Sequence, residues 1–194
     1  MSEFLPSDIT NQIIVSQLHE GAVTFANGQQ ANNHLDLGYD ETAPQLRSHI
    51  IDAFSRLLFV KNIDVDFIIP VPSGAEGWVE AYVSRLPTAP DVIRLRKIQK
   101  RQFELCSDLD SSDYTGKHGI VVDDATSDGG TSEAAADYAT KQGFTITAVV
   151  SFIVRGQQLA PSKYSRLWLA HQPIPAMLDW NIFRQQGTIQ QLSV

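Results

Sequence analysis

Apolar residues recur with helical spacing in two segments near the amino terminus. In residues 8–20 the apolar positions fall near a period of 3.6, Ser7 or Asp8 is a plausible N-cap, and Gly21 follows as a stop. Residues 42–61 repeat the pattern over a longer stretch, with leucine, isoleucine and phenylalanine on one face. The spacing therefore predicts one short and one long amphipathic helix.

Between these helices, residues 22–37 have the pattern of two short strands. The runs AVTF and HLDL flank Asn27-Gly28, a dipeptide that suits the positive φ angles of a tight hairpin turn. We therefore expect a β-hairpin in this segment.

From residue 66 onward, short apolar runs alternate with helical segments. The runs that predict strands are 66–71, 91–95, 119–123, 145–154 and 166–170. The run 145–154 is the richest in β-branched residues and should form a central strand. Helices are expected from residue 78 to about 86 and over 131–142, where Gly143 follows as a stop. This alternation predicts an α/β fold with a mainly parallel sheet flanked by helices, and ligands bind such sheets at the carboxyl ends of the strands.

Residues 96–118 interrupt this alternation, because they show neither a helical nor a strand period. The segment has 23 residues, against a usual loop length of about 4–6. Basic residues gather at its start and acidic residues follow: Arg96, Lys97, Lys100, Arg101, Glu104, Asp108, Asp110 and Asp113. It is either a mobile surface loop or a lid whose basic start closes over a polyanion.

Composition narrows the class of protein. The chain has 194 residues, 43% of them hydrophobic, which suits one globular domain. A net charge of -7 argues against nonspecific nucleic-acid binding. No uncharged apolar run is long enough to span a membrane, and the start lacks the pattern of a signal peptide. The single cysteine, Cys106, fits a reducing compartment, so we expect a cytoplasmic protein.

The stretch GIVVDDATSDGGTSEAA, which begins at Gly119, carries the most chemical information. Asp123 and Asp124 follow a buried strand, and the next residues are small, hydroxyl-bearing or glycine before a helix begins. Backbone N–H groups in such a loop suit a phosphate, whereas the two carboxylates suit vicinal hydroxyls or a metal. A phosphate close to a diol describes a ribose 5-phosphate. The alternative is that the two acids only cap the following helix.

VVDDATSDGGTS resembles the phosphoribosyl pyrophosphate (PRPP) signature of type I phosphoribosyltransferases. The resemblance implies that Asp123 and Asp124 contact the ribose hydroxyls and hold Mg²⁺ indirectly, through PRPP. It implies that IIPVPSGAEG is the pyrophosphate loop and that 96–118 is the catalytic loop, with Lys97, Lys100 and Arg101 stabilising the departing pyrophosphate. The implied PRPP-binding residues are Ser73, Gly74, Ala75, Arg96, Asp123, Asp124, Ala125, Thr126, Ser127, Asp128, Gly129, Gly130 and Thr131.

Within that family the sequence is most similar to orotate phosphoribosyltransferases. Asn27-Gly28 and His34-Leu35-Asp36 fall at the spacing of the hood that helps to bind the base, and Arg155 follows the strand 145–154. The likeness implies base contacts from Arg155, Asn27 and Thr126. It implies PRPP and a nucleobase, orotate favoured, as substrates and a homodimer as the assembly.

The same resemblance divides the chain into three parts and leaves two alternatives open. Residues 1–40 should hold the first helix and the hood hairpin, 41–170 the PRPP-binding core, and 171–194 a C-terminal segment of the same domain. Three residues depart from the family pattern by removing positive or adding negative charge: Ala26, Glu76 and Asp128. Another nucleobase, or a non-catalytic PRPP- or nucleotide-binding regulator on the same fold, is therefore the alternative.

Overall fold

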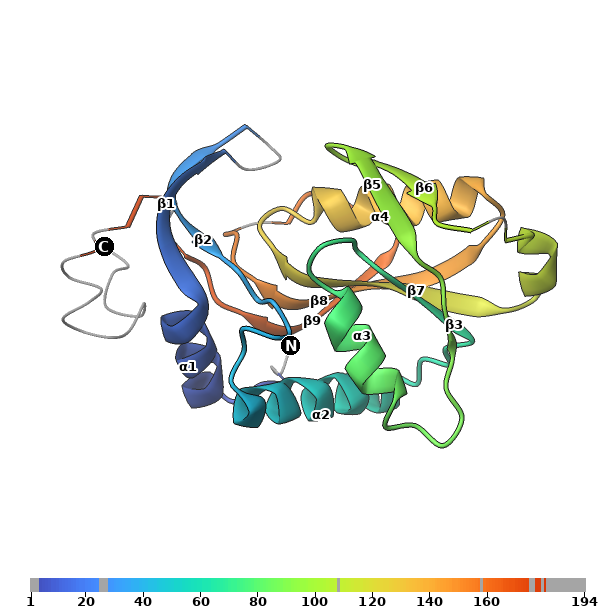
Figure 1. Ribbon diagram of the computed structural model, residues 1–194, viewed down its shortest axis with the longest axis horizontal. Helices are drawn as coiled ribbons and strands as arrows, with labels where there is room; N and C mark the ends of the chain where they lie inside the picture. Colours follow the sequence, from blue (N-terminus) through green and yellow to red (C-terminus); the bar gives the residue numbers. More distant parts are fainter. Residues whose placement is uncertain are drawn as a thin grey trace.

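A five-stranded parallel sheet forms the centre of the molecule, as the sequence predicted, in the computed structural model shown in Figure 1. The structure describes residues 4–24, 28–107, 109–157, 159–174, 177, 178 and 180. The elements in chain order are α1 (Ser7–Gln17), β1 (Leu18–Thr24), β2 (Gln30–Leu35), α2 (Pro44–Val60), β3 (Phe67–Pro70), α3 (Glu76–Val83), β4 (Asp91–Val92), β5 (Leu95–Gln99), β6 (Gln102–Leu105), the 3₁₀ helix η1 (Ser111–Tyr114), β7 (His118–Thr126), α4 (Gly130–Lys141), β8 (Thr145–Val154) and β9 (Ser165–His171).

The strand order of the sheet is β4-β3-β7-β8-β9. The chain leaves β3 toward one edge of the sheet and returns to add β7 on the other side of β3. The carboxyl ends of β3 and β7 therefore flank a topological switch point, where α/β sheets bind ligands. β8 lies one place from the centre, which β7 occupies.

Two apolar layers hold the helices against the sheet. In Figure 1, α2 and α3 lie below the sheet and α4 lies above it. Successive side chains of β7 point to opposite faces of the sheet. Ile120 and Val122 pack in the cluster with α2 and α3, and Val121 packs in the cluster with α4. All three are fully buried, which explains why the strand is a continuous apolar run rather than an alternating one.

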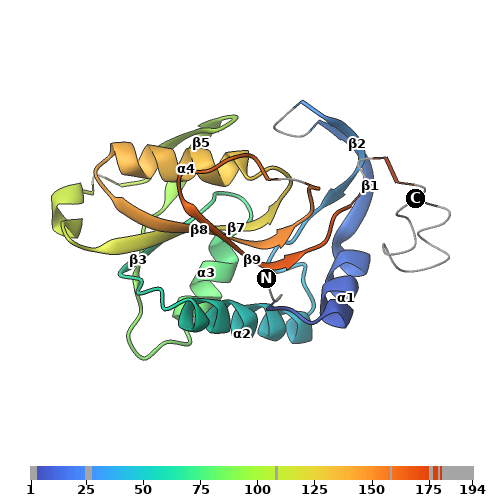
Figure 2. The same ribbon diagram turned by 180° about the vertical axis from the view of Figure 1, so that it is seen from behind.

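The hood hairpin, β1 and β2, stands at one end of the sheet (Figures 1 and 2). Asn32 of β2 anchors the end of the chain to it: Asn32 Nδ2 donates to the Leu178 carbonyl, the Leu178 N–H donates back to Asn32 Oδ1, and both distances are 2.8 Å. Trp180 Nε1 donates to the Asn32 carbonyl at 3.2 Å. The hood is therefore tied to the C-terminal segment as well as to α1.

Two predicted boundaries in the amino-terminal part are wrong. Helix α1 ends at Gln17, three residues before the predicted end, because Leu18 already pairs with Leu35 of β2 and Gly21 lies inside the strand. Neither predicted cap forms; Pro6 is the N-cap and makes no side-chain bond. The predicted turn residue Asn27 lies outside the described residues.

The strand predicted for 91–95 pairs with β3 only through Asp91 and Val92. The chain then turns away, and 95–105 form an antiparallel hairpin, β5–β6, which we name the lid hairpin. The hairpin has no strand signal in the sequence because four of the five residues of β5 are exposed. The prediction of an irregular segment over 96–118 is therefore wrong for residues 96–105.

None of the helices in the described parts of the chain is long and apolar enough to cross a membrane.

Candidate functional site

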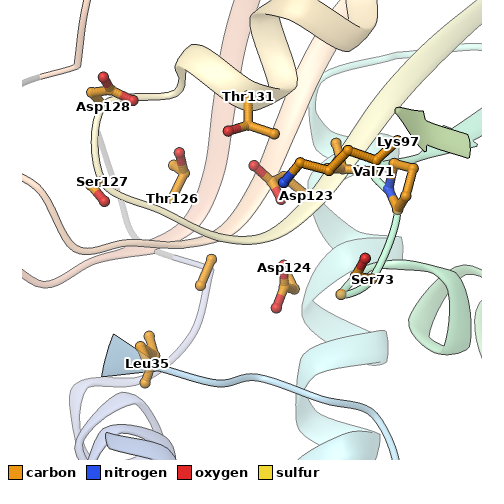
Figure 3. A pocket seen from close by; sticks show the side chains of 13 residues that line it. Leu35, Val71, Ser73, Lys97, Asp123, Asp124, Thr126, Ser127, Asp128 and Thr131 are labelled. Carbon is orange, nitrogen blue, oxygen red and sulfur yellow. The ribbon is translucent and has the colours of Figure 1, made fainter. Parts of the chain in front are cut away.

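A cavity of about 280 Å³ lies at the carboxyl ends of β3 and β7, where the sequence placed the ligand. Figure 3 shows its centre, where Asp123 and Thr131 lie near the end of the Lys97 side chain and Asp124 faces Ser73. The residues that line it are Leu35, Val71, Pro72, Ser73, Gly74, Lys97, Asp123, Asp124, Ala125, Thr126, Ser127, Asp128 and Thr131.

Asp123 and Asp124 lie beyond the end of β3 but remain inside β7, because β7 pairs with the long strand β8 as far as Thr126 and Val154. Strand β7 is thus three residues longer than predicted at this end. Asp123 is only 5% exposed. Burial, and after it the charge of Asp124, raises the pKa of Asp123 well above its usual value, although a hydrogen bond from Ser132 acts in the opposite direction. Burial also raises the pKa of Asp124 to about 6.

Gly74, in the β3–α3 loop (residues 71–75), has a specific steric role. A Cβ atom at this position would lie 2.3 Å from Oδ1 of Asp124. Glycine therefore lets the loop pack against the half-buried Asp124 carboxylate, which a side chain here would displace. This contact brings the two loops that the sequence singled out to the same cavity.

The β7–α4 loop (residues 127–129) ends at Gly129, whose φ of 77° is the left-handed conformation that glycine adopts without strain. The Gly129 N–H donates to Thr126 Oγ1 at 2.9 Å. The Gly130 N–H, at the start of α4, donates to Oδ1 of Asp128, also at 2.9 Å. Asp128 therefore does not turn away from the loop: its carboxylate accepts from one of the N–H groups that the family resemblance assigns to a phosphate.

The β3–α3 loop shows the same arrangement. The Ser73 N–H donates to Oε2 of Glu76 at 2.8 Å, and Ser73 has a positive φ of 79°. Ser73 and Gly74 line the cavity, whereas Ala75 is buried at the start of α3. Glu76 thus supplies an internal acceptor where the sequence predicted a pyrophosphate.

The four predicted basic residues of the lid hairpin have different surroundings. Lys97 lines the cavity. Arg96 pairs with Glu104 across the hairpin, and Lys100 is exposed at the turn. Arg101 has a positive φ of 60° and donates from Nη2 to Oδ2 of Asp128 at 2.9 Å. One of the four therefore faces the cavity and another reaches its rim through Asp128.

Arg155, predicted to contact the base, is 5% exposed and is absent from the residues that line the cavity. It donates from Nη2 to Oδ1 of Asn33, a fully buried residue of the hood. Burial lowers the pKa of Arg155 to about 10. Asn27, the other predicted hood contact, lies outside the described residues, and Thr126 lines the cavity.

Sequence reasoning missed Leu35, Asn33 and Arg166. Leu35 forms the hood wall of the cavity and lies within the His34-Leu35-Asp36 segment that the resemblance had already indicated. Arg166 donates from Nη1 to the Asp128 carbonyl and from Nη2 to Glu133, at 3.1 and 2.9 Å. Arg166 lies in a strand 38 residues beyond Asp128, and no local pattern indicates this contact.

The donor set fits a magnesium ion that is held mainly by its ligand. Two adjacent carboxylates face the cavity, and no cluster of three or more metal-binding side chains occurs among the described residues. Mg²⁺ typically takes one or two carboxylates and completes its coordination with phosphate oxygens and water.

The comparison with protein families identifies the class of protein. Residues 41–184 match the phosphoribosyl transferase domain. This match spans more than half of the chain, so the protein belongs to the phosphoribosyltransferase family, and the predicted family is confirmed. No curated protein sequence matches the chain.

Solved structures agree in fold at low sequence identity. Orotate phosphoribosyltransferase from Aeropyrum pernix has a TM-score of 0.63 and 14% identity, over 91% of this chain and 97% of that one. The enzyme from Mycobacterium tuberculosis has a TM-score of 0.59 and 16% identity, over 84% and 94%. Adenine phosphoribosyltransferase from Saccharomyces cerevisiae has a TM-score of 0.61 and 17% identity, over 85% and 100%. At these identities the similarity shows the fold alone.

Proposed function

We propose that the protein transfers the 5-phosphoribosyl group of PRPP to a nucleobase and releases pyrophosphate. The observation that carries the proposal is that one cavity brings together the Asp123–Asp124 carboxylate pair, the start of α4 and one lysine of the lid hairpin. Carboxylates suit the ribose hydroxyls, N–H groups and Thr131 suit the 5-phosphate, and Lys97 suits the pyrophosphate.

The proposed chemistry is stabilisation of charge that develops as the bond between C1 and pyrophosphate breaks. The nitrogen of the base forms the new bond to C1, and pyrophosphate leaves with the electron pair. Asp123 and Asp124 hold the ribose through its hydroxyls and face the positive charge on the ring, whereas Lys97 stabilises the leaving group. Lys100 and Arg101 are proposed to assist from the lid hairpin. Bound Mg²⁺ would offset the charge of the pyrophosphate, and Asp123 and Asp124 would hold it through PRPP.

Orotate is the proposed base, because Arg155 lies at the carboxyl end of β8 and a guanidinium is the natural partner of a carboxylate. For orotate to bind there, the Arg155 guanidinium must donate to the carboxylate of the base as well as to Asn33. A homodimer and a cytoplasmic location remain predictions.

The test is pyrophosphate release from PRPP and Mg²⁺ with orotate, adenine, hypoxanthine, guanine and uracil in parallel. Turnover with orotate alone supports the proposal. Turnover with another base and none with orotate removes orotate and retains the phosphoribosyltransferase. The matched variants are Lys97→Gln, which faces the cavity, and Lys61→Gln, an exposed residue at the end of α2. Only the first is expected to lower turnover, by about tenfold or more.

The second candidate is a regulator that binds PRPP or a nucleotide without turnover. It is favoured by one observation: Glu76 and Asp128 each occupy a backbone N–H group of a loop that the first candidate uses for an anion. Calorimetry distinguishes the two, because saturable PRPP binding with no pyrophosphate release from any base favours the regulator.

A further inference from the structure

The β7–α4 loop is held between two arginines that approach its consecutive glycines. A Cβ atom at Gly129 would lie 2.0 Å from Nη1 of Arg166, and one at Gly130 would lie 2.1 Å from Nη2 of Arg101. The two guanidinium groups thus pack directly on the backbone of the glycine pair, where a side chain would displace them. One comes from the turn of the lid hairpin and the other from β9.

This contact region has more donors than acceptors. The two carboxylate oxygens of Asp128 accept one bond each, from Arg101 and from the Gly130 N–H. Among the described residues, the buried Nε atoms of Arg101 and Arg166 have no hydrogen-bond acceptor. A buried donor without an acceptor is costly, and that of a charged group is more so. The region is thus organised for an anion that brings more oxygens than a carboxylate does.

Asp128 lies between the cavity and Arg101. Asp128 is one of the residues that line the cavity, whereas Arg101 is not. The ion pair between Arg101 Nη2 and Asp128 Oδ2, at 2.9 Å, joins Arg101 to the cavity. In Figure 3, Asp128 lies at the rim, beyond Ser127 and Thr126. An anion that binds at the start of α4 therefore competes with the Asp128 carboxylate for the same hydrogen-bond donors.

We propose that Asp128 and Arg101 form a latch that the phosphate of a ligand opens. The phosphate replaces the Asp128 carboxylate on the Gly130 N–H and on Arg101, so that Arg101 becomes a phosphate-binding residue of the occupied site. A phosphate has three free oxygens, one more than the carboxylate, and the third can accept from Nε of Arg101. Binding of the 5-phosphate is thereby coupled to the position of the lid hairpin, whose Lys97 faces the cavity. The proposal rests on the proposed function only for the presence of a phosphate ester in the ligand.

The test is calorimetric titration with ribose 5-phosphate, in the absence of any base, at one fixed ionic strength. Asp128→Asn is expected to bind about tenfold more tightly, because it removes a like charge that competes for the same donors. Arg101→Gln is expected to bind about tenfold more weakly. Glu80→Gln removes an exposed carboxylate that pairs with Arg94 and changes net charge equally, so it should bind like the unmodified chain within twofold.

Hydrogen exchange of residues 95–105 provides the second measurement. In Asp128→Asn without ligand these amides should exchange about fivefold faster, and ribose 5-phosphate should restore their protection. Faster exchange with unchanged affinity would show that Asp128 only holds the hairpin, and it would overturn the proposal. Weaker binding by Asp128→Asn, or no binding by either protein, would overturn it as well. Failure of base-dependent turnover with the expected binding results would count against the proposed function alone.

Discussion

Two groups of carboxylates at the β7–α4 loop differ in how their charge is balanced. Asp123 and Asp124 lie side by side in the cavity before the loop, and burial raises the pKa of each. Within the loop Asp128 bonds to Arg101 and a backbone N–H, and after it Glu133 pairs with Arg166. The first pair lowers the free energy of unfolding at neutral pH, whereas the second group raises it. The difference separates a carboxylate pair that destabilises the fold from carboxylates whose contacts hold the loop in place.

The largest expected change in stability comes from removing the arginine that pairs with Glu133. Arg166→Met keeps the aliphatic stem but leaves Glu133 without its cation, where the two side chains are 12% and 19% exposed. Loss of one partner from a buried pair costs about 3 kcal/mol. Urea unfolding should show this decrease in the free energy of unfolding. Arg85→Met breaks an exposed pair with Asp52 and should cost less than about 0.5 kcal/mol. Equal losses in the two variants would contradict the comparison.

Removal of a charge from the Asp123–Asp124 pair should instead raise the free energy of unfolding. Asp124→Asn is expected to raise the free energy of unfolding at pH 7 by about 2 kcal/mol, because a buried charge beside Asp123 is lost. The same change should lower turnover about 100-fold through the lost ribose contact. Urea unfolding and pyrophosphate release measure the two effects. Asp52→Asn, at an exposed position, should change neither by much. A destabilised Asp124→Asn would show that the charge is compensated after all.

The pH dependence of stability follows from the same carboxylate. The pKa of Asp124 is raised from 3.8 to about 6 on folding, so the folded protein binds the proton more tightly than the unfolded chain does. This contribution to stability is present at low pH and is lost as pH rises from about 4 to 6. Between pH 7 and pH 5 the chain should gain about 1 kcal/mol relative to Asp124→Asn. Unfolding of both proteins across this range measures the difference, and parallel pH curves would contradict it.

The smallest effect is expected in the β3–α3 loop. Glu76→Gln retains an oxygen that can accept from the Ser73 N–H, so the free energy of unfolding should fall by only about 0.5 kcal/mol. Because the change removes a negative charge beside the cavity, affinity for pyrophosphate should rise a few-fold. Calorimetry with pyrophosphate measures this. Unchanged affinity would show that Glu76 does not compete with the ligand.

Much of the core followed from the sequence because its signals are local. The run 145–154 is strand β8 without any change of boundary, and Asp123, Asp124, Thr126 and Thr131 all line the predicted cavity. A β-branched run and a glycine-rich turn each carry their own conformational preference. The roles of these residues in binding remain predictions.

What the sequence did not indicate depends on contacts between distant segments. The lid hairpin has exposed side chains, so backbone pairing rather than apolar periodicity forms it. The Asp128 side chain is oriented by Arg101, 27 residues earlier in the chain. Arg155 turned out to be covered by Asn33, 122 residues away, and no pattern near Val154 reports this. Such pairings are decided by tertiary packing.

The tie between Asn32 and the segment at 178–180 provides a natural optical probe of the hood. The indole N–H of Trp180 donates to the Asn32 carbonyl, whereas Trp78 is fully buried under the sheet with its own donor bound to Leu37. A ligand that moves the hood should therefore alter the emission of Trp180. A Trp180→Phe variant, which retains Trp78 and Trp168, identifies the part of a fluorescence change that comes from this anchor.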